Sequence, residues 1–278
     1  LAVLGRHPTA AIVAWVSGSD LVGAAIVIWM FADARKRFAE VETIPVSFRE
    51  YLLYAARVGS VSLVSLMNYR ADVYVVAIFT TPAMLGMYTL AVTAAETLLT
   101  ATQVTAVVTL PHVGSMERDA AAQLTARCVR HNVIVAAVTC GILALAAPWI
   151  VGTLYGQAFL PMVPALRILL LGVFALSLGS PMSNFFTLRL GKPEIPLVLA
   201  SASAILCIGT SIVLVPRIGL TGAAIGSTVA YVLGQAAAIV YFSIVSGISA
   251  ERMLVPRLSD VETYFSIVAG FARRLRRT

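Results

Sequence analysis

The stretch at residues 132–151, NVIVAAVTCGILALAAPWIV, runs for 20 positions without a charged side chain. At a rise of about 1.5 Å per residue, an α-helix of this length crosses the roughly 30 Å of hydrocarbon in a lipid bilayer. The apolar residues show no strict alternation, which argues against a strand of a transmembrane barrel. The stretch therefore predicts a membrane-spanning α-helix.

Comparable apolar stretches occur along most of the chain. With 59% hydrophobic and 12% charged residues, and a mean hydropathy of +0.91, the composition lies far outside the range of water-soluble domains. We therefore predict an all-α, polytopic membrane protein of about seven transmembrane helices. The expected spans are approximately residues 8–31, 51–79, 86–110, 132–151, 164–188, 193–215 and 219–246.

Lysine and arginine gather in alternate loops between these spans. The loops at 80–85 and 152–163 carry no charge, and the loop at 215–220 carries only Arg217. By the positive-inside rule, the basic loops and the carboxyl-terminal tail face the cytoplasm. The basic residues are Arg35, Lys36, Arg37 and Arg49, then Arg118, Arg127 and Arg130, then Arg189 and Lys192, and finally Arg273, Arg274, Arg276 and Arg277.

Motifs for catalysis or metal binding do not occur in the sequence. There is no nucleophile elbow, phosphate-binding loop or zinc motif. We predict no enzyme, no disulfide, no metal site and no nucleic-acid partner, and assign the net charge of +7 to the membrane-flanking loops. The number of cysteines is odd, and the spacing of Cys128, Cys140 and Cys207 is not typical of a metal site. The histidines His7, His112 and His131 are expected at helix ends.

Polar residues within the third span recur at helical spacing. Because they follow i, i+4, i+7, i+11 and i+14, they share one narrow face of a continuous helix. Two interpretations remain open: the face lines an aqueous cavity, or it makes hydrogen bonds between packed helices. The residues are Thr89, Thr93, Glu96, Thr100 and Gln103, called here the polar stripe.

Charged residues at membrane depth are costly and usually functional. In the second span Asn68 and Asp72 share a face, and Arg70 points nearly the opposite way. Either that helix bends, or Arg70 pairs with a carboxylate of another helix, for which Asp20 and Glu96 are candidates. The sequence does not choose between these alternatives.

Three other segments have a recognisable packing pattern. In the fifth span, Pro181 predicts a kink, with Asn184 on the same side. The small residues spaced from Gly222 to Ala238 in the last span predict close helix packing. The tail at 259–275 predicts an interfacial amphipathic basic helix, with a disordered tail as the alternative.

Four motifs together resemble a known family. They are LMNYRADVYVV at 66–76, TPAMLGMYTLA at 81–91, LYGQAF at 154–159 and VPRIGLTGAA at 215–224. In order and spacing they are similar to the polysaccharide flippases of the multidrug/oligosaccharidyl-lipid/polysaccharide exporter superfamily. Members have two six-helix bundles around a central cavity.

The resemblance implies a domain organisation. Residues 1–31 would be the last helix of the first bundle, 32–50 a cytoplasmic loop, 51–246 a complete second bundle and 247–278 a cytoplasmic tail. Because the chain opens with Leu1 and moves almost at once into a span, we expect it to lack most of the amino-terminal half.

The resemblance also implies a function. It is the translocation, by alternating access, of an undecaprenyl-diphosphate-linked oligosaccharide across the bacterial cytoplasmic (inner) membrane, for O-antigen, capsule or exopolysaccharide assembly. Lipid-linked oligosaccharide and membrane lipids are the expected partners, and polysaccharide polymerase and chain-length machinery are further candidates. No cofactor is expected; a proton or sodium gradient is the candidate energy source.

Candidate roles follow for individual residues. Arg70 is the leading contact for the diphosphate. Asp20, Asp72 and Glu96 are candidates for charge balance or for uptake of a coupling cation. The expected hydrogen-bonding partners of the sugar are Asn68, Thr93, Thr100, Gln103 and Asn184.

Two rival functions remain. A cation-coupled drug antiporter of the same superfamily would depend on Glu96 and Asp72 more than on Arg70. A membrane scaffold without transport activity would tolerate Ala and Leu throughout the polar stripe.

Single cysteines test the topology. Cysteines replacing Lys36 and Lys192 should react with a membrane-impermeant thiol reagent only from the cytoplasmic side, and one replacing Thr81 only from outside, because basic loops stay in the cytoplasm. The unsubstituted chain measures labelling of the native cysteines. Labelling of all three positions from the same side would overturn the helix count.

Overall fold

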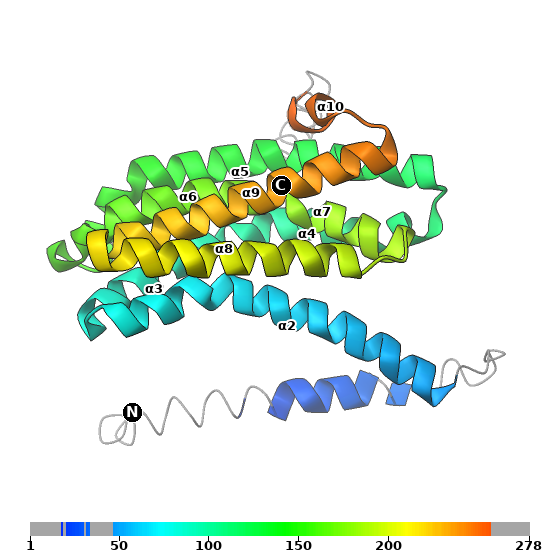
Figure 1. Ribbon diagram of the computed structural model, residues 1–278, viewed down its shortest axis with the longest axis horizontal. Coiled ribbons are helices and arrows are strands. Elements are labelled where there is room, and N and C mark those ends of the chain that lie inside the picture. Colours follow the sequence, from blue (N-terminus) through cyan, green and yellow to red (C-terminus); the bar gives the residue numbers. More distant parts are fainter. Residues whose placement is uncertain (1–17, 19–20, 31, 34–46, 257–278) are drawn as a thin grey trace, which may run out of the picture. The chain divides into compact units, whose positions relative to one another are not determined.

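The computed structural model describes Gly18 and residues 21–30, 32–33 and 47–256 (Figure 1). The chain divides into two compact units, Leu1–Tyr51 and Leu52–Thr278. In the first unit, the described residues include a short apolar helix, Leu21–Met30. The second unit contains the bundle of helices that forms the rest of the structure.

The elements follow one another with short connections. Helix α2 begins in the first unit and continues into the second; η1 is a 3₁₀-helix and η2 a π-helix. Their bounds are α2 (Phe48–Phe79), α3 (Pro82–Thr97), α4 (Leu99–Ser115), α5 (Arg118–Leu154), η1 (Gln157–Met162), α6 (Val163–Leu176), α7 (Gly179–Asn184), η2 (Phe185–Arg189), α8 (Glu194–Ile218), α9 (Leu220–Ser246) and α10 (Ala250–Leu254).

The all-helical prediction is confirmed, because the described residues contain helices and no strand. Five helical segments within them are long and apolar enough to cross a membrane. The predicted total of seven spans stays a prediction. The five are Pro82–Ser115, Arg118–Leu154, Gln157–Arg189, Glu194–Ile218 and Leu220–Ser246.

Two predicted spans differ in detail from the helices observed. The span predicted at 86–110 lies within the membrane-length segment Pro82–Ser115, but a turn at Leu98 divides that segment into α3 and α4. The span predicted at 132–151 begins earlier, at Arg118, because residues 118–131 are rich in helix-forming alanine and arginine. Arg118, Arg127 and Arg130 therefore lie in α5 instead of a loop, and His131 lies inside that helix.

The kink predicted at Pro181 is present as a break between α6 and α7. Proline has no N–H, so Pro181 leaves the carbonyl of Ser177, four residues earlier, without its helical partner. Asn132 of α5 donates its Nδ2 to this carbonyl at 2.8 Å, and its Oδ1 accepts from Thr105 of α4 at 2.8 Å. One fully buried asparagine thus joins α4, α5 and the α6–α7 break.

A second proline is compensated in the same way. Pro148 lies inside α5 and leaves the carbonyl of Ala144 without a helical donor. Arg167 of α6 donates its Nε to that carbonyl at 2.9 Å. In hydrocarbon an unsatisfied backbone carbonyl costs several kcal/mol, so both contacts fix neighbouring helices to α5.

Helices α8 and α9 approach closely, as the spacing of small residues predicts. A Cβ on Gly222 would meet the backbone of Leu214 at 2.6 Å, and one on Gly226 would meet Ser211 Oγ at 2.6 Å. Larger residues at these positions would force the helices apart. The glycines of α9 therefore serve tight packing.

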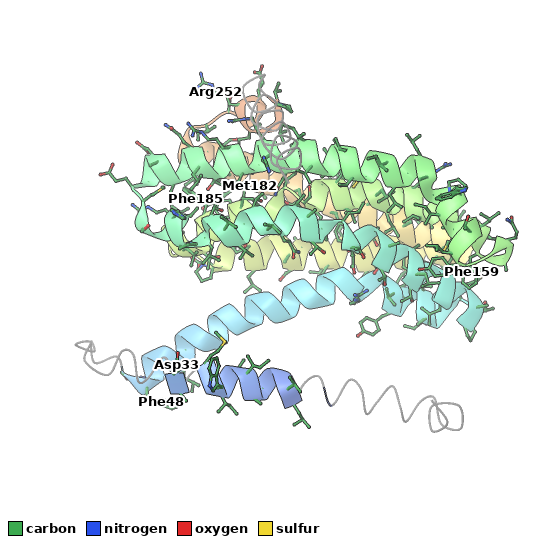
Figure 2. All side chains as sticks on the ribbon, turned by 180° about the vertical axis from the view of Figure 1, so that it is seen from behind. Asp33, Phe48, Phe159, Met182, Phe185 and Arg252 are labelled. Atoms are coloured by element: carbon green, nitrogen blue, oxygen red, sulfur yellow. The ribbon has the colours of Figure 1, made fainter. Side chains whose placement is uncertain are left out.

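The buried side chains form two main hydrophobic clusters within this unit. One surrounds Tyr88 and Leu166 and is covered at its edge by Phe159. The other contains Met182, Phe185 and Phe242, with the Phe185 and Phe242 rings 5.0 Å apart. Figure 2 shows Phe159 and Phe185 toward opposite ends of the bundle. The clusters hold the helices together along their length.

The role of Asn132 predicts a measurable coupling. Asn132→Ala should lower the free energy of unfolding by about 1–3 kcal/mol, because the Ser177 carbonyl loses its donor. In a Pro181→Ala background the cost should be smaller, since alanine at that position supplies the missing N–H. Thermal unfolding in detergent micelles measures both.

Thr139→Ala is the matched control on α5, because the Thr139 hydroxyl donates to the carbonyls of Val135 and Ala136 in its own helix and, among the described residues, to no other helix. An equal cost of Asn132→Ala in both backgrounds would contradict the proline compensation.

Candidate functional site

The carboxylate of Asp72 lies at the meeting point of three helices and is 1% exposed. Its Oδ2 accepts from the hydroxyl of Tyr88 on α3 at 2.5 Å and from Ser227 Oγ on α9 at 2.6 Å. Its Oδ1 accepts from the N–H of Val73 at 2.8 Å. These three hydrogen bonds replace water around a buried carboxylate, which would otherwise be very costly.

Ser227 lies between Asp72 and the close contact of α9 with α8. Gly226 removes a side chain at the contact, and Cys207 Sγ of α8 lies 3.6 Å from Ser227 Oγ. Ser227 also donates to the carbonyl of Ala223 in its own helix at 3.1 Å. The cluster of Asp72, Tyr88 and Ser227, called here the carboxylate cluster, is therefore buried and joins α2, α3 and α9.

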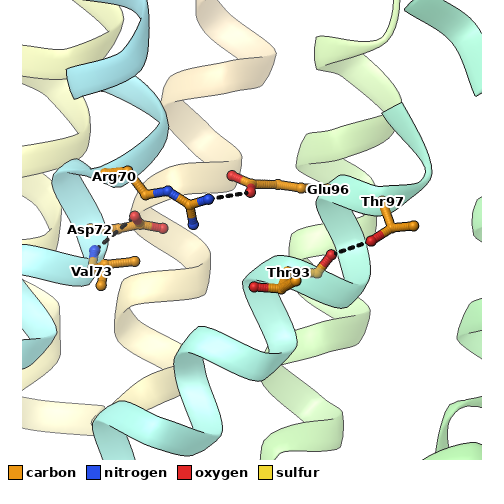
Figure 3. Close-up of polar contacts among 6 residues, drawn as sticks. All are labelled: Arg70, Asp72, Val73, Thr93, Glu96 and Thr97. Atoms are coloured by element: carbon orange, nitrogen blue, oxygen red, sulfur yellow. Dashed lines mark hydrogen bonds and ion pairs between the residues drawn. The ribbon is translucent and has the colours of Figure 1, made fainter. Parts of the chain in front are cut away.

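Arg70 pairs with Glu96, one of the two partners that the sequence left open. Its Nη2 lies 3.2 Å from Glu96 Oε2 near the end of α3 (Figure 3). The Arg70 side chain is 42% exposed and that of Glu96 is 22% exposed. Among the described residues, the guanidinium makes this ion pair and no hydrogen bond, so further donors remain for an anionic partner.

The polar stripe lies on the open side of α3 and α4. Thr93, Thr100 and Gln103 are exposed, and Thr89 and Glu96 are half-buried. Thr89 donates to the carbonyl of Leu85 in its own helix. Within the part of the chain that the structure describes, the threonines of the stripe donate to no other helix. The stripe therefore makes no threonine hydrogen bond to another described helix, and its contact with an aqueous cavity stays a prediction.

The opposite face of α4 packs against neighbouring helices. Thr102 is buried, and Thr105 donates to Asn132. Asn184, at the end of α7, donates its Nδ2 to the carbonyl of Ala106 on α4 at 3.0 Å. Asn184 thus lies apart from the stripe and joins two helices, with its Oδ1 remaining as an acceptor.

Several predicted residues fall outside the described part of the chain. Asp20 and the tail at 259–275 are among them, as is the side chain of Asn68. Their predicted roles stay predictions. The structure brings together Arg70 and Glu96, and separately joins Asp72 to residues that the sequence analysis did not single out.

Four polar residues were missed by sequence reasoning. Tyr88 and Ser227 bind Asp72, Arg167 donates to the Ala144 carbonyl within α5, and the half-buried Gln235 lies against Gly179 of α7. Arg167 and Gln235 each lie within an apolar span, which is the signal that should have found them. Tyr88 and Ser227 carry no such signal, because hydroxyls are common in membrane helices.

When the chain is compared with known proteins, one family model matches it. A model described as polysaccharide biosynthesis protein matches residues 1–164, more than half of the 278 residues. The match covers Arg70, Asp72 and Glu96 and ends before α7, α8 and α9. Neither a curated protein nor a solved structure gave a match.

Thiol reactivity tests the aqueous interpretation of the stripe. Thr93→Cys and Thr100→Cys should react with a water-soluble thiol reagent in membranes. Thr102→Cys should not, because that position on α4 is buried. Leu145→Cys should not, because Leu145, although 83% exposed in the protein, is expected to face lipid.

Equal protection of all four cysteines would support packing against another protein surface instead of water.

Proposed function

Because the chain belongs to the polysaccharide biosynthesis protein family, we propose that it forms part of a flippase for lipid-linked oligosaccharides. Its family works in polysaccharide synthesis or export. The proposed substrate is an undecaprenyl-diphosphate-linked oligosaccharide, moved from the inner to the outer leaflet of the bacterial cytoplasmic membrane. The chain would contribute the second of two helix bundles.

The physical problem of this reaction is the polar head of the substrate. A diphosphate and the sugar hydroxyls lose their hydration in hydrocarbon, which is prohibitive unless protein groups replace it. A protein that solves this problem needs a cation for the diphosphate and many neutral hydrogen-bonding groups for the sugar. Both kinds of group occur on the open side of α2, α3 and α4.

The observation that carries the proposal is the Arg70–Glu96 ion pair beside the polar stripe. Glu96 balances the arginine charge while no substrate is bound, and the partial exposure of Arg70 leaves it accessible. A diphosphate offers more negative charge and more acceptors than one carboxylate, so it can compete for the guanidinium. Glu96 would then be released toward water.

The polar stripe would form hydrogen bonds with the sugar hydroxyls. Thr93, Thr100 and Gln103 are exposed; Thr93 precedes Glu96 in α3, and Thr100 and Gln103 follow it in α4. Hydroxyl and amide groups bind sugar hydroxyls without holding them by charge, which suits a substrate that must leave again. The two bundles would expose this surface to each side of the membrane in turn.

The carboxylate cluster is the proposed place of energy coupling. Asp72 Oδ2 accepts both hydroxyls that link it to α3 and α9. A proton or a sodium ion arriving at Asp72 would compete with those hydroxyls. Their release would loosen α2 from the two helices, which connects ion uptake to a movement beside Arg70.

Substitution of Arg70 tests the proposal in cells that lack their own flippase. Arg70→Gln should abolish polysaccharide export at a normal protein level, and Arg70→Lys should retain part of it because lysine keeps a positive charge. Export is measured as surface polysaccharide, and protein level by immunoblot of membranes.

The structural alternative has its own signature. If Arg70 serves only to neutralise Glu96, Arg70→Gln lowers protein abundance and Arg70→Gln with Glu96→Gln restores both abundance and export. Arg217→Gln is the control, because Arg217 bonds the Val213 carbonyl of its own helix. Normal export by Arg70→Gln would contradict the substrate-binding role.

A further inference from the structure

A cleft of about 260 Å³ lies between α7, α8 and α9, apart from Arg70 and the stripe. Its wall combines the polar side chains of Ser180, Ser183, Asn184, Ser203 and Gln235 with the apolar faces of neighbouring residues. Ser180, Ser183 and Asn184 are half-buried. The cleft is therefore open to a ligand from outside the bundle.

One buried polar atom in the cleft has no partner among the residues that the structure describes. Gln235 Oε1 is buried, and no described group donates to it. Such an atom costs about 1–3 kcal/mol in a protein interior. A ligand that brings a hydrogen-bond donor would remove this cost.

Gly179 leaves space for Gln235 in the wall of the cleft. A Cβ on Gly179 would meet the Gln235 carboxamide at 2.7–3.0 Å, so the amide lies directly against the backbone of α7. Alanine at position 179 would therefore displace the carboxamide without removing it.

The chemistry of the wall limits the ligand. Among the described residues that line the cleft there is no lysine, arginine, aspartate or glutamate, so a charged group there would have no counter-charge from them and would be strongly disfavoured. Phe186 and Tyr231 add aromatic surface. Neutral polar groups and apolar surface thus share the wall of the cleft about equally, which suits a small neutral ligand that has both hydroxyl groups and C–H faces.

The volume of the cleft limits the size of the ligand. Liquid water occupies about 30 Å³ per molecule, so the cleft has room for a small group such as one sugar ring and not for an oligosaccharide. A pyranose has hydroxyl donors for Gln235 Oε1 and acceptors for the serine hydroxyls. Its C–H faces suit aromatic and aliphatic walls.

We propose that this cleft binds one uncharged sugar unit of the lipid-linked substrate, with a sugar hydroxyl donating to Gln235 Oε1. The inference rests on the proposed function and adds a selectivity site for the sugar within the second bundle. Selectivity would favour neutral sugars over uronic acids, because a carboxylate would remain unpaired in the cleft.

The test follows protection of a cysteine that replaces Ser183. Probes are undecaprenyl diphosphate carrying a neutral glucose–galactose disaccharide, undecaprenyl diphosphate alone, and the same lipid carrying a glucuronic acid. The protein is used as the full chain in nanodiscs. At about ten times its Kd, the neutral glycolipid should slow labelling about tenfold, because only the unoccupied fraction reacts.

Two further variants, each combined with the Ser183→Cys reporter, test the acceptor. Gln235→Leu should raise the concentration needed for half-protection about tenfold, the equivalent of one hydrogen bond, and Gly179→Ala should do the same by pushing the carboxamide away. The matched controls are Gln123→Leu, an exposed glutamine on α5, and Gly86→Ala, whose added Cβ would meet no atom within 4 Å.

Other outcomes separate this inference from the proposed function. Equal protection by all three probes, or protection unchanged by Gln235→Leu and Gly179→Ala, would overturn the sugar site. If the glycolipid protects Thr100→Cys but not Ser183→Cys, the cleft holds water only and the flippase proposal stands. If it protects neither cysteine, the proposed function fails together with the inference.

Discussion

Every polar group in a membrane helix must find a partner inside the protein, because hydrocarbon offers none. The structure depends on this constraint. Pro181 and Pro148 each leave a carbonyl without a helical donor, and Asn132 and Arg167 supply the missing hydrogen bonds from neighbouring helices. The Asp72 carboxylate accepts hydrogen bonds from the hydroxyls of Tyr88 and Ser227, which lie on two further helices. The same contacts that prevent unsatisfied groups therefore decide which helices lie together.

The groups that remain incompletely satisfied are informative for the same reason. Arg70 uses only part of its guanidinium on Glu96, the stripe leaves Thr100 and Gln103 exposed, and Gln235 Oε1 has no partner among the described residues. Each costs free energy in a resting membrane protein unless water or a polar ligand reaches it. The diphosphate-linked sugar that we propose as the substrate would be such a ligand, and the proposal thereby connects these otherwise separate positions.

The sequence predicted the all-helical membrane fold because span length and apolar composition depend only on local residues. It also predicted the break at Pro181 and the close packing of α9, since each follows from proline or glycine chemistry. It did not predict the partners of Asp72, because Tyr88 and Ser227 lie 16 and 155 residues away and hydroxyls have no distinctive pattern. For Arg70 it named Glu96 but left Asp20 open, since only tertiary structure decides between helices. The break at Leu98 was missed because Leu98 is neither proline nor glycine.

The most direct measurement is photo-crosslinking in growing cells whose lipid-linked oligosaccharide carries a radioactive sugar. A photoreactive amino acid replacing Gln103 on the stripe should capture a sugar-labelled adduct, because that surface is proposed to contact the substrate head. The same amino acid replacing Leu145, an exposed apolar position on α5, should capture only unlabelled lipid. Sugar-labelled adducts of equal yield at both positions, or none at Gln103, would contradict the claim that this polar surface contacts the substrate.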